Sequence, residues 1–85
     1  MDPANLRAHI ALGETLLREG DLERAQEYLE KAAKLGGDIP RIFNSLGEVY
    51  LRRGLKVEAA RAFRRSLSLE PKQASVRQRL DETAR

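Results

Sequence analysis

The 85-residue sequence contains no cysteine and no tryptophan, and it has a single histidine. Without cysteine the chain forms no disulfide, thiolate metal site or cysteine nucleophile, and one histidine excludes a pair of histidine ligands. No apolar run approaches the roughly 18 residues of a membrane-spanning helix, and the first residues lack the regions of a secretory signal peptide. We therefore expect a cytoplasmic, non-catalytic chain that needs no cofactor and does not bind membranes.

Charge is unevenly distributed along the chain. Residues 1–39 carry eight acidic and five basic residues, a net charge of −3, whereas residues 40–85 carry five acidic and eleven basic residues, a net charge of +6. Such asymmetry can steer an acidic partner to the basic half or favour association of copies. It also fits two solvated faces with no partner at all.

The sequence repeats itself with a 34-residue period, which is typical of helical repeat proteins. Leu12-Gly13-Glu14 recurs as Leu46-Gly47-Glu48 without any gap. The other identical pairs are Arg7 and Arg41, Leu17-Arg18 and Leu51-Arg52, Gly20 and Gly54, Ala25 and Ala59, and Leu35 and Leu69. A further step takes Leu46 to Leu80, which indicates the start of a third copy.

Apolar residues recur at spacings of three and four in each copy, and this pattern predicts two helices per repeat. We expect the first helix to run from about Pro3, capped by Asp2, to Arg18. Gly20 and Asp21 should end it and cap the next helix, which runs to about Leu35. The prediction is an all-α chain of five helices, with repeats at about residues 6–39 and 40–73 and a final helix from about Pro71 to Ala84.

Two helical glycines require an explanation, because glycine costs about 1 kcal/mol relative to alanine inside a helix. We expect Gly13 and Gly47 to mark close helix crossings, with Ala25 and Ala59 on the facing helices. A larger side chain at either glycine should overpack the crossing.

These residues resemble the tetratricopeptide repeat, whose 34-residue unit has the pattern W-x2-L-G-x2-Y, then A-x3-F, then P. The first copy matches as His9-x2-Leu12-Gly13-x2-Leu16 and Ala25-x3-Leu29, and the second as Phe43-x2-Leu46-Gly47-x2-Tyr50 and Ala59-x3-Phe63. The residues that carry the repeat are Leu12, Gly13, Ala25, Leu46, Gly47, Tyr50, Ala59, Phe63 and Pro71. The resemblance implies a short right-handed α-solenoid, closed by a capping helix, as a segment of a longer array.

The resemblance also implies a protein-interaction scaffold whose first helices line a concave groove. The positions that match this groove are Arg7, Ile10, Glu14, Leu17, Arg18, Arg41, Asn44, Glu48, Leu51, Arg52, Gln78 and Glu82. Glutamates at these positions would repel a terminal carboxylate, so we expect a protein or peptide ligand with basic and apolar groups. Alternatively, the glutamates only support their own helices, through pairs such as Glu14 with Arg18 and Glu48 with Arg52.

Three other functions remain to be weighed. The basic half of the chain could bind nucleic acid or an acidic partner, because its arginines and lysines can neutralise phosphates. Against nucleic acid, the four aromatic residues all occupy positions with the periodicity of the core, which leaves no aromatic surface for stacking bases. A structural spacer, or a chain that associates with copies of itself, would need no groove. Catalysis has the weakest support, because the sequence has no cysteine or second histidine that could bind a metal together with His9, and it has no phosphate-binding loop.

Overall fold

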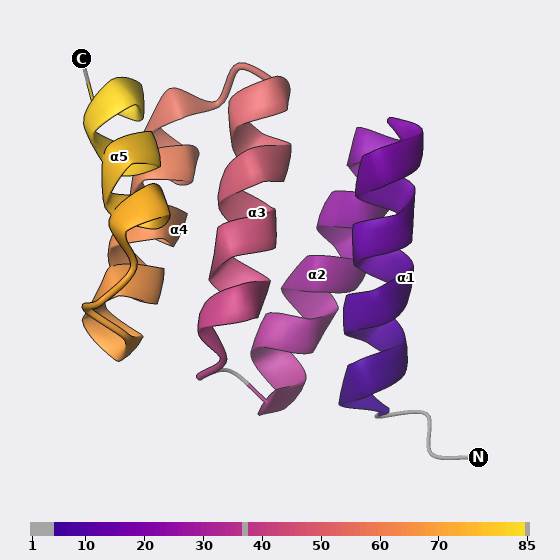
Figure 1. Cartoon of the computed structure of the whole chain (residues 1–85). Coiled ribbons are helices and arrows are strands. Elements are labelled where there is room, and N and C mark those ends of the chain that lie inside the picture. The colour runs from indigo at the N-terminus through magenta and orange to yellow at the C-terminus, as the bar shows by residue number, and fades with distance from the viewer. Residues whose placement is uncertain (1–4, 37, 85) are drawn as a thin grey trace.

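The computed structural model describes residues 5–36 and 38–84, which form five α-helices (Figure 1). The helices are α1 (Leu6–Glu19), α2 (Leu22–Gly36), α3 (Pro40–Arg52), α4 (Lys56–Leu69) and α5 (Ala74–Thr83). No strand occurs among the described residues. The predicted all-α repeat fold of five helices is confirmed.

The first helix begins later than the sequence indicates. Asn5 is the N-cap of α1, and its side-chain oxygen accepts a hydrogen bond from the Ala8 amide at 3.0 Å. An asparagine in this role satisfies one of the free amides of the first turn. The expected start at Pro3 is therefore wrong; Asp2 and Pro3 themselves lie outside the described residues.

Each repeat has the predicted glycine turn between its two helices, but only the first repeat has a side chain that caps the helix after the turn. Gly20 and Gly54 have positive φ angles of 86° and 79°, the left-handed conformation that glycine adopts without strain. Asp21 accepts a hydrogen bond from the Arg24 amide at 3.3 Å and so caps α2. Leu55, the N-cap of α4, makes no such side-chain bond.

The last helix begins at Ala74 rather than at Pro71. Glu70 ends α4 in an extended conformation, which the following proline favours. Gln73 then fixes the connection, since its Nε2 donates to the Ser66 carbonyl, the Ser66 hydroxyl and the Glu70 carbonyl at 2.8–3.1 Å. Pro71 therefore lies in the connecting segment and α5 is shorter than expected.

The close crossings at Gly13 and Gly47 are confirmed. A Cβ atom at Gly13 would lie 2.6 Å from Leu29 Cγ, and one at Gly47 would lie 2.5 Å from the Phe63 ring. Leu29 and Phe63 are 0% and 2% exposed, so both side chains are enclosed by the protein. The glycines thus bring the two helices of each repeat together, and the large side chains fill the crossing.

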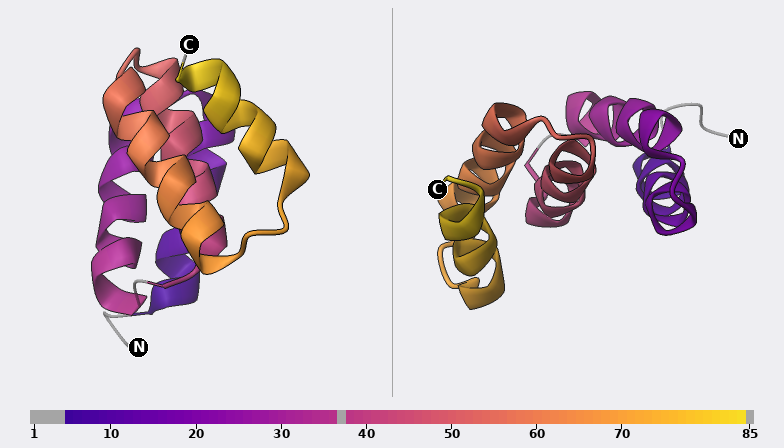
Figure 2. Two further views of the ribbon diagram at one scale, coloured as in Figure 1. Left: turned by 90° about the vertical axis from the view of Figure 1, so that its left-hand side faces the viewer. Right: turned by 90° about the horizontal axis from the view of Figure 1, so that it is seen from above.

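The helices pack in chain order, α1 with α2, α2 with α3, α3 with α4 and α4 with α5, and α1 also contacts α3. Seen from above, α1, α3 and α5 lie along one side of a shallow arc and α2 and α4 along the other (Figure 2). We call these the inner and the outer side. The larger core cluster joins the first four helices, and a second cluster of Ala59, Phe63 and Val76 attaches α5.

Candidate functional site

The residues predicted to line a groove belong to α1, α3 and α5, the helices of the inner side. Their helical spacing of three and four places them on one side of each helix. We call the following set the inner face: Arg7, Glu14, Leu17, Arg18, Arg41, Asn44, Glu48, Leu51, Arg52, Gln78 and Glu82. A shallow hollow of about 290 Å³ between Arg7, Ile10, Ala11 and Arg41 lies where α1 meets α3.

Glu14 on α1 is bonded to side chains of α3, the first helix of the second repeat. Its carboxylate accepts two hydrogen bonds from the Arg41 guanidinium, at 2.7 Å from Nε and 2.5 Å from Nη2, and a third from the Ser45 hydroxyl at 3.3 Å. The Glu14 side chain is 19% exposed. The bond with Glu14 raises the pKa of Arg41 above its ordinary value. This two-point pairing fixes the direction of both side chains.

Glu48, the equivalent of Glu14 in the second repeat, is also held by the next first helix. Its carboxylate accepts a hydrogen bond from Arg79 Nη2 on α5, and Arg52 Nε lies 3.6 Å away on α3 itself. Arg79 follows Ser45 by one repeat length, so one position of the repeat supplies a donor to both glutamates. Ser45 and Arg79 were not among the predicted site residues, although the 34-residue period places them at the same position of successive repeats.

The ion pair expected between each glutamate and the arginine four residues later forms in α3 only, among the described residues. Glu48 pairs with Arg52, whereas Glu14 has no ion pair with Arg18 within 4 Å in the described part of the chain. Arg18 instead donates to the Thr15 hydroxyl at 3.4 Å. The glutamates consequently link successive first helices, and their negative charge is compensated by arginines.

The middle of the inner face is continuous with the segment before α5. Asn44 Nδ2 donates to Gln73 Oε1 at 3.0 Å, which joins α3 to that segment. The Asn44 Oδ1 atom is buried and has no hydrogen-bond partner among residues 5–36 and 38–84. Gln73 was not among the predicted site residues, because a contact across 29 positions has no local signal.

The apolar members of the predicted groove differ in accessibility. Leu17 and Leu51 are half-buried and pack on the edges of the two core clusters. Ile10 is 7% exposed and belongs to the larger cluster, so little of its side chain can reach a ligand. The remaining four positions, Arg7, Arg18, Gln78 and Glu82, are exposed.

In the described residues, no three histidine, cysteine or acidic side chains gather as a metal site. His9 Nδ1 lies 2.8 Å from the Asn5 carbonyl oxygen, and its ring packs 5.9 Å from that of Tyr28. His9 is thus half-buried and packs beside Tyr28. Over the same described residues, none of the helices is long and apolar enough to cross a membrane.

Comparison with known proteins gives one finding. A family model described as Tetratricopeptide repeat matches residues 2–74, which is more than half of the chain. No curated protein matches it.

Proposed function

Because the chain belongs to the tetratricopeptide repeat family, a family of protein-interaction scaffolds, we propose that its inner face binds a peptide or helix of a partner protein, without catalysis. The observation that carries this proposal is the repeated link between first helices, Glu14 with Arg41 and Glu48 with Arg79. Side chains that are already held in place lose less conformational entropy when a ligand binds.

The chemistry of the inner face indicates the kind of partner. Leu17 and Leu51 present half-buried apolar surface at equivalent positions of the two repeats. The carboxylates of Glu14 and Glu48 keep lone pairs that the arginines do not use, and these can accept bonds from basic side chains of a ligand. A segment that combines basic and apolar residues is therefore the proposed partner. Arg7, which is exposed, can donate to its backbone carbonyls or acidic groups.

A pull-down from host lysate, read out by mass spectrometry, tests this proposal. The variant Glu14→Gln/Glu48→Gln removes both negative charges and keeps an acceptor for the arginines. We expect it to lose partners with basic segments roughly tenfold.

The matched control is Glu23→Gln/Glu70→Gln, which makes the same change in net charge at exposed positions away from the inner face. It should retain the partners, and both variants should keep the native helical content. Equal losses in both variants would indicate general charge attraction. Unchanged capture by both would assign recognition to another face or leave the chain as a spacer.

A further inference from the structure

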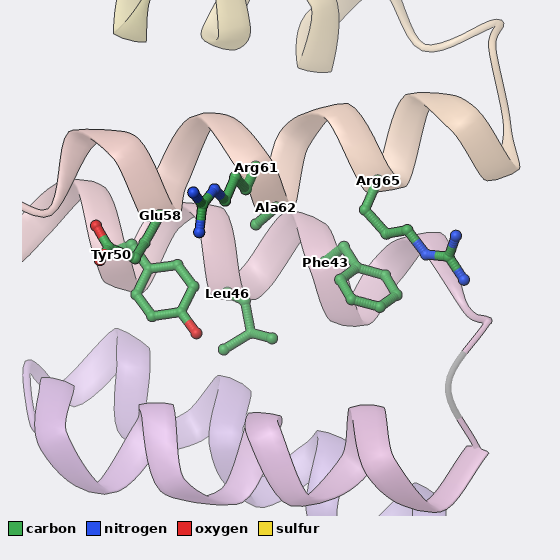
Figure 3. A pocket seen from close by; sticks show the side chains of 7 residues that line it. All are labelled: Phe43, Leu46, Tyr50, Glu58, Arg61, Ala62 and Arg65. Carbon is green, nitrogen blue, oxygen red and sulfur yellow. The ribbon is translucent and has the colours of Figure 1, made fainter.

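The outer side of the second repeat has an open hollow of about 290 Å³ between α3 and α4, which we call the outer pocket (Figure 3). Phe43, Leu46 and Tyr50 line it from α3, and Glu58, Arg61, Ala62 and Arg65 line it from α4. The Tyr50 hydroxyl donates to Glu30 on α2 at 2.6 Å, which anchors that ring. None of these side chains belongs to the inner face, so the two surfaces can bind partners independently.

In the first repeat the equivalent space holds one of the chain's own side chains. Tyr28 stands one repeat length before Ala62, and its ring packs against His9, the equivalent of Phe43. Lys31, the equivalent of Arg65, places its ammonium 5.7 Å from the centre of the Tyr28 ring. The first repeat thus shows an aromatic ring between a second ring and a cation.

The second repeat keeps the surroundings of that ring and lacks the ring itself. Arg65 lies 5.8 Å from the centre of the Phe43 ring, as a cation beside an aromatic wall. Ala62 supplies a methyl group where Tyr28 supplies a phenol. For comparison, an apolar cavity of about 150 Å³ is enough to bind benzene. The outer pocket therefore has room for an aromatic side chain that the chain does not provide.

The charges around the pocket also differ between the repeats. In the first repeat Glu27 lies 3.8 Å from Lys31 as its ion-pair partner. The equivalent of Glu27 is Arg61, so the second repeat has a cation where the first has a carboxylate. Arg65 is paired with Asp38 at 2.7 Å, whereas Arg61 has no carboxylate within 4 Å in the described part of the chain. Glu58 also lines the pocket, and its equivalent in the first repeat is Arg24. A ligand that fits the pocket therefore brings a ring, with a negative charge placed where it meets Arg61.

We propose that the outer pocket is a second docking site, which binds an aromatic side chain of an acidic partner segment. The ring takes the place against Phe43 that Tyr28 takes against His9. A carboxylate beside the ring pairs with Arg61, since burial of the ring in the pocket brings its neighbours to the pocket rim.

Titration of the isotope-labelled chain, followed by NMR, tests the site with defined probes. The probe is a short acetylated peptide with a central tyrosine flanked by glutamates. We expect it to shift the amide signals of Phe43, Arg61 and Ala62. A peptide with alanine in place of tyrosine should give no shifts at these amides, and a peptide with glutamines in place of the glutamates should bind about two- to five-fold more weakly. Equal shifts with all three peptides would overturn the proposal.

Two substitutions separate the ring from the charge. Ala62→Tyr places the chain's own ring in the pocket and should abolish binding of the acidic tyrosine peptide. Arg61→Gln should weaken this binding about two- to five-fold. The matched control is Arg64→Gln, because Arg64 is exposed on the same helix and does not line the pocket.

Each variant can support or overturn the proposal. Native affinity in a folded Ala62→Tyr variant would overturn it, as would equal weakening by Arg61→Gln and Arg64→Gln. If Ala62→Tyr does not fold, the two arginine variants decide. A short single-stranded DNA that shifts the same amides more strongly than the acidic peptide would also overturn the assignment to a protein partner.

Discussion

The helices α1 and α3 are equivalent in sequence and differ in their surroundings. On the side that faces α2, α3 presents Ile42, Leu46 and Val49, which are 0%, 4% and 0% exposed. The equivalent positions of α1 carry an exposed alanine, a leucine that is 39% exposed and a half-buried threonine, namely Ala8, Leu12 and Thr15. The two repeats therefore share the residues of the crossing between their own helices, and they differ at the positions of α1 and α3 that face, or would face, a preceding helix.

The apolar residues of α1 differ in how far they are covered. Leu6 is half-buried, but Ile10 is 7% exposed, because its helical position faces the core cluster rather than the edge. Leu12 is the large apolar side chain that α1 exposes.

The largest predicted effect concerns the crossing that both repeats share. Gly47→Ala should lower the free energy of unfolding by about 1–3 kcal/mol, although alanine is the better helix former. Three atoms of the buried Phe63 ring would lie 2.5–2.7 Å from the new methyl carbon. Gly13→Ala should cost less, because one of the three nearest Leu29 atoms is 3.4 Å away. Urea unfolding followed by circular dichroism measures both. A gain in stability from either substitution would show that the crossing is loose.

The next prediction tests the difference between the two edges. Val49→Thr should lower the free energy of unfolding by about 1–3 kcal/mol, because it places a hydroxyl in a fully buried position against α2. The reciprocal change, Thr15→Val, should alter it by no more than about 0.5 kcal/mol at the half-buried edge of α1. Equal effects at the two sites, measured by the same urea titration, would mean that α1 is covered in solution.

The 34-residue period predicted the helices, the glycine crossings and the turn glycines, because these depend on contacts within one repeat. The contacts between repeats were missed. Arg41 pairs with Glu14 across 27 positions, a separation that no helical spacing encodes. The outer pocket was also not predicted, because it is recognised only when the surroundings of Ala62 and of Tyr28 are compared in the structure. The start of α5 depended on the bonds of Gln73, which periodicity does not reveal.

The smallest predicted effect is the dependence of stability on alkaline pH, to which Tyr50 contributes and its equivalent in the first repeat, Leu16, cannot. Burial, the hydrogen bond to Glu30 and the charge of Glu58 raise the pKa of Tyr50 above its ordinary value of about 10. The unfolded chain therefore loses this proton first, so the stability from Tyr50 is complete below about pH 10 and is lost as the pH rises beyond it. Tyr50→Phe should show a smaller alkaline loss of melting temperature than the native chain.

The most direct test of the account is a crystal structure of the Ala62→Tyr variant. If the space beside Phe43 is equivalent to the one that Tyr28 fills beside His9, the introduced ring will lie in the outer pocket against Phe43, tilted and under Arg65, as Tyr28 lies against His9 and under Lys31. The backbones of α3 and α4 should remain in place. A ring that points into solvent, or one that separates α4 from α3, would contradict both the equivalence of these two spaces and the free room in the second.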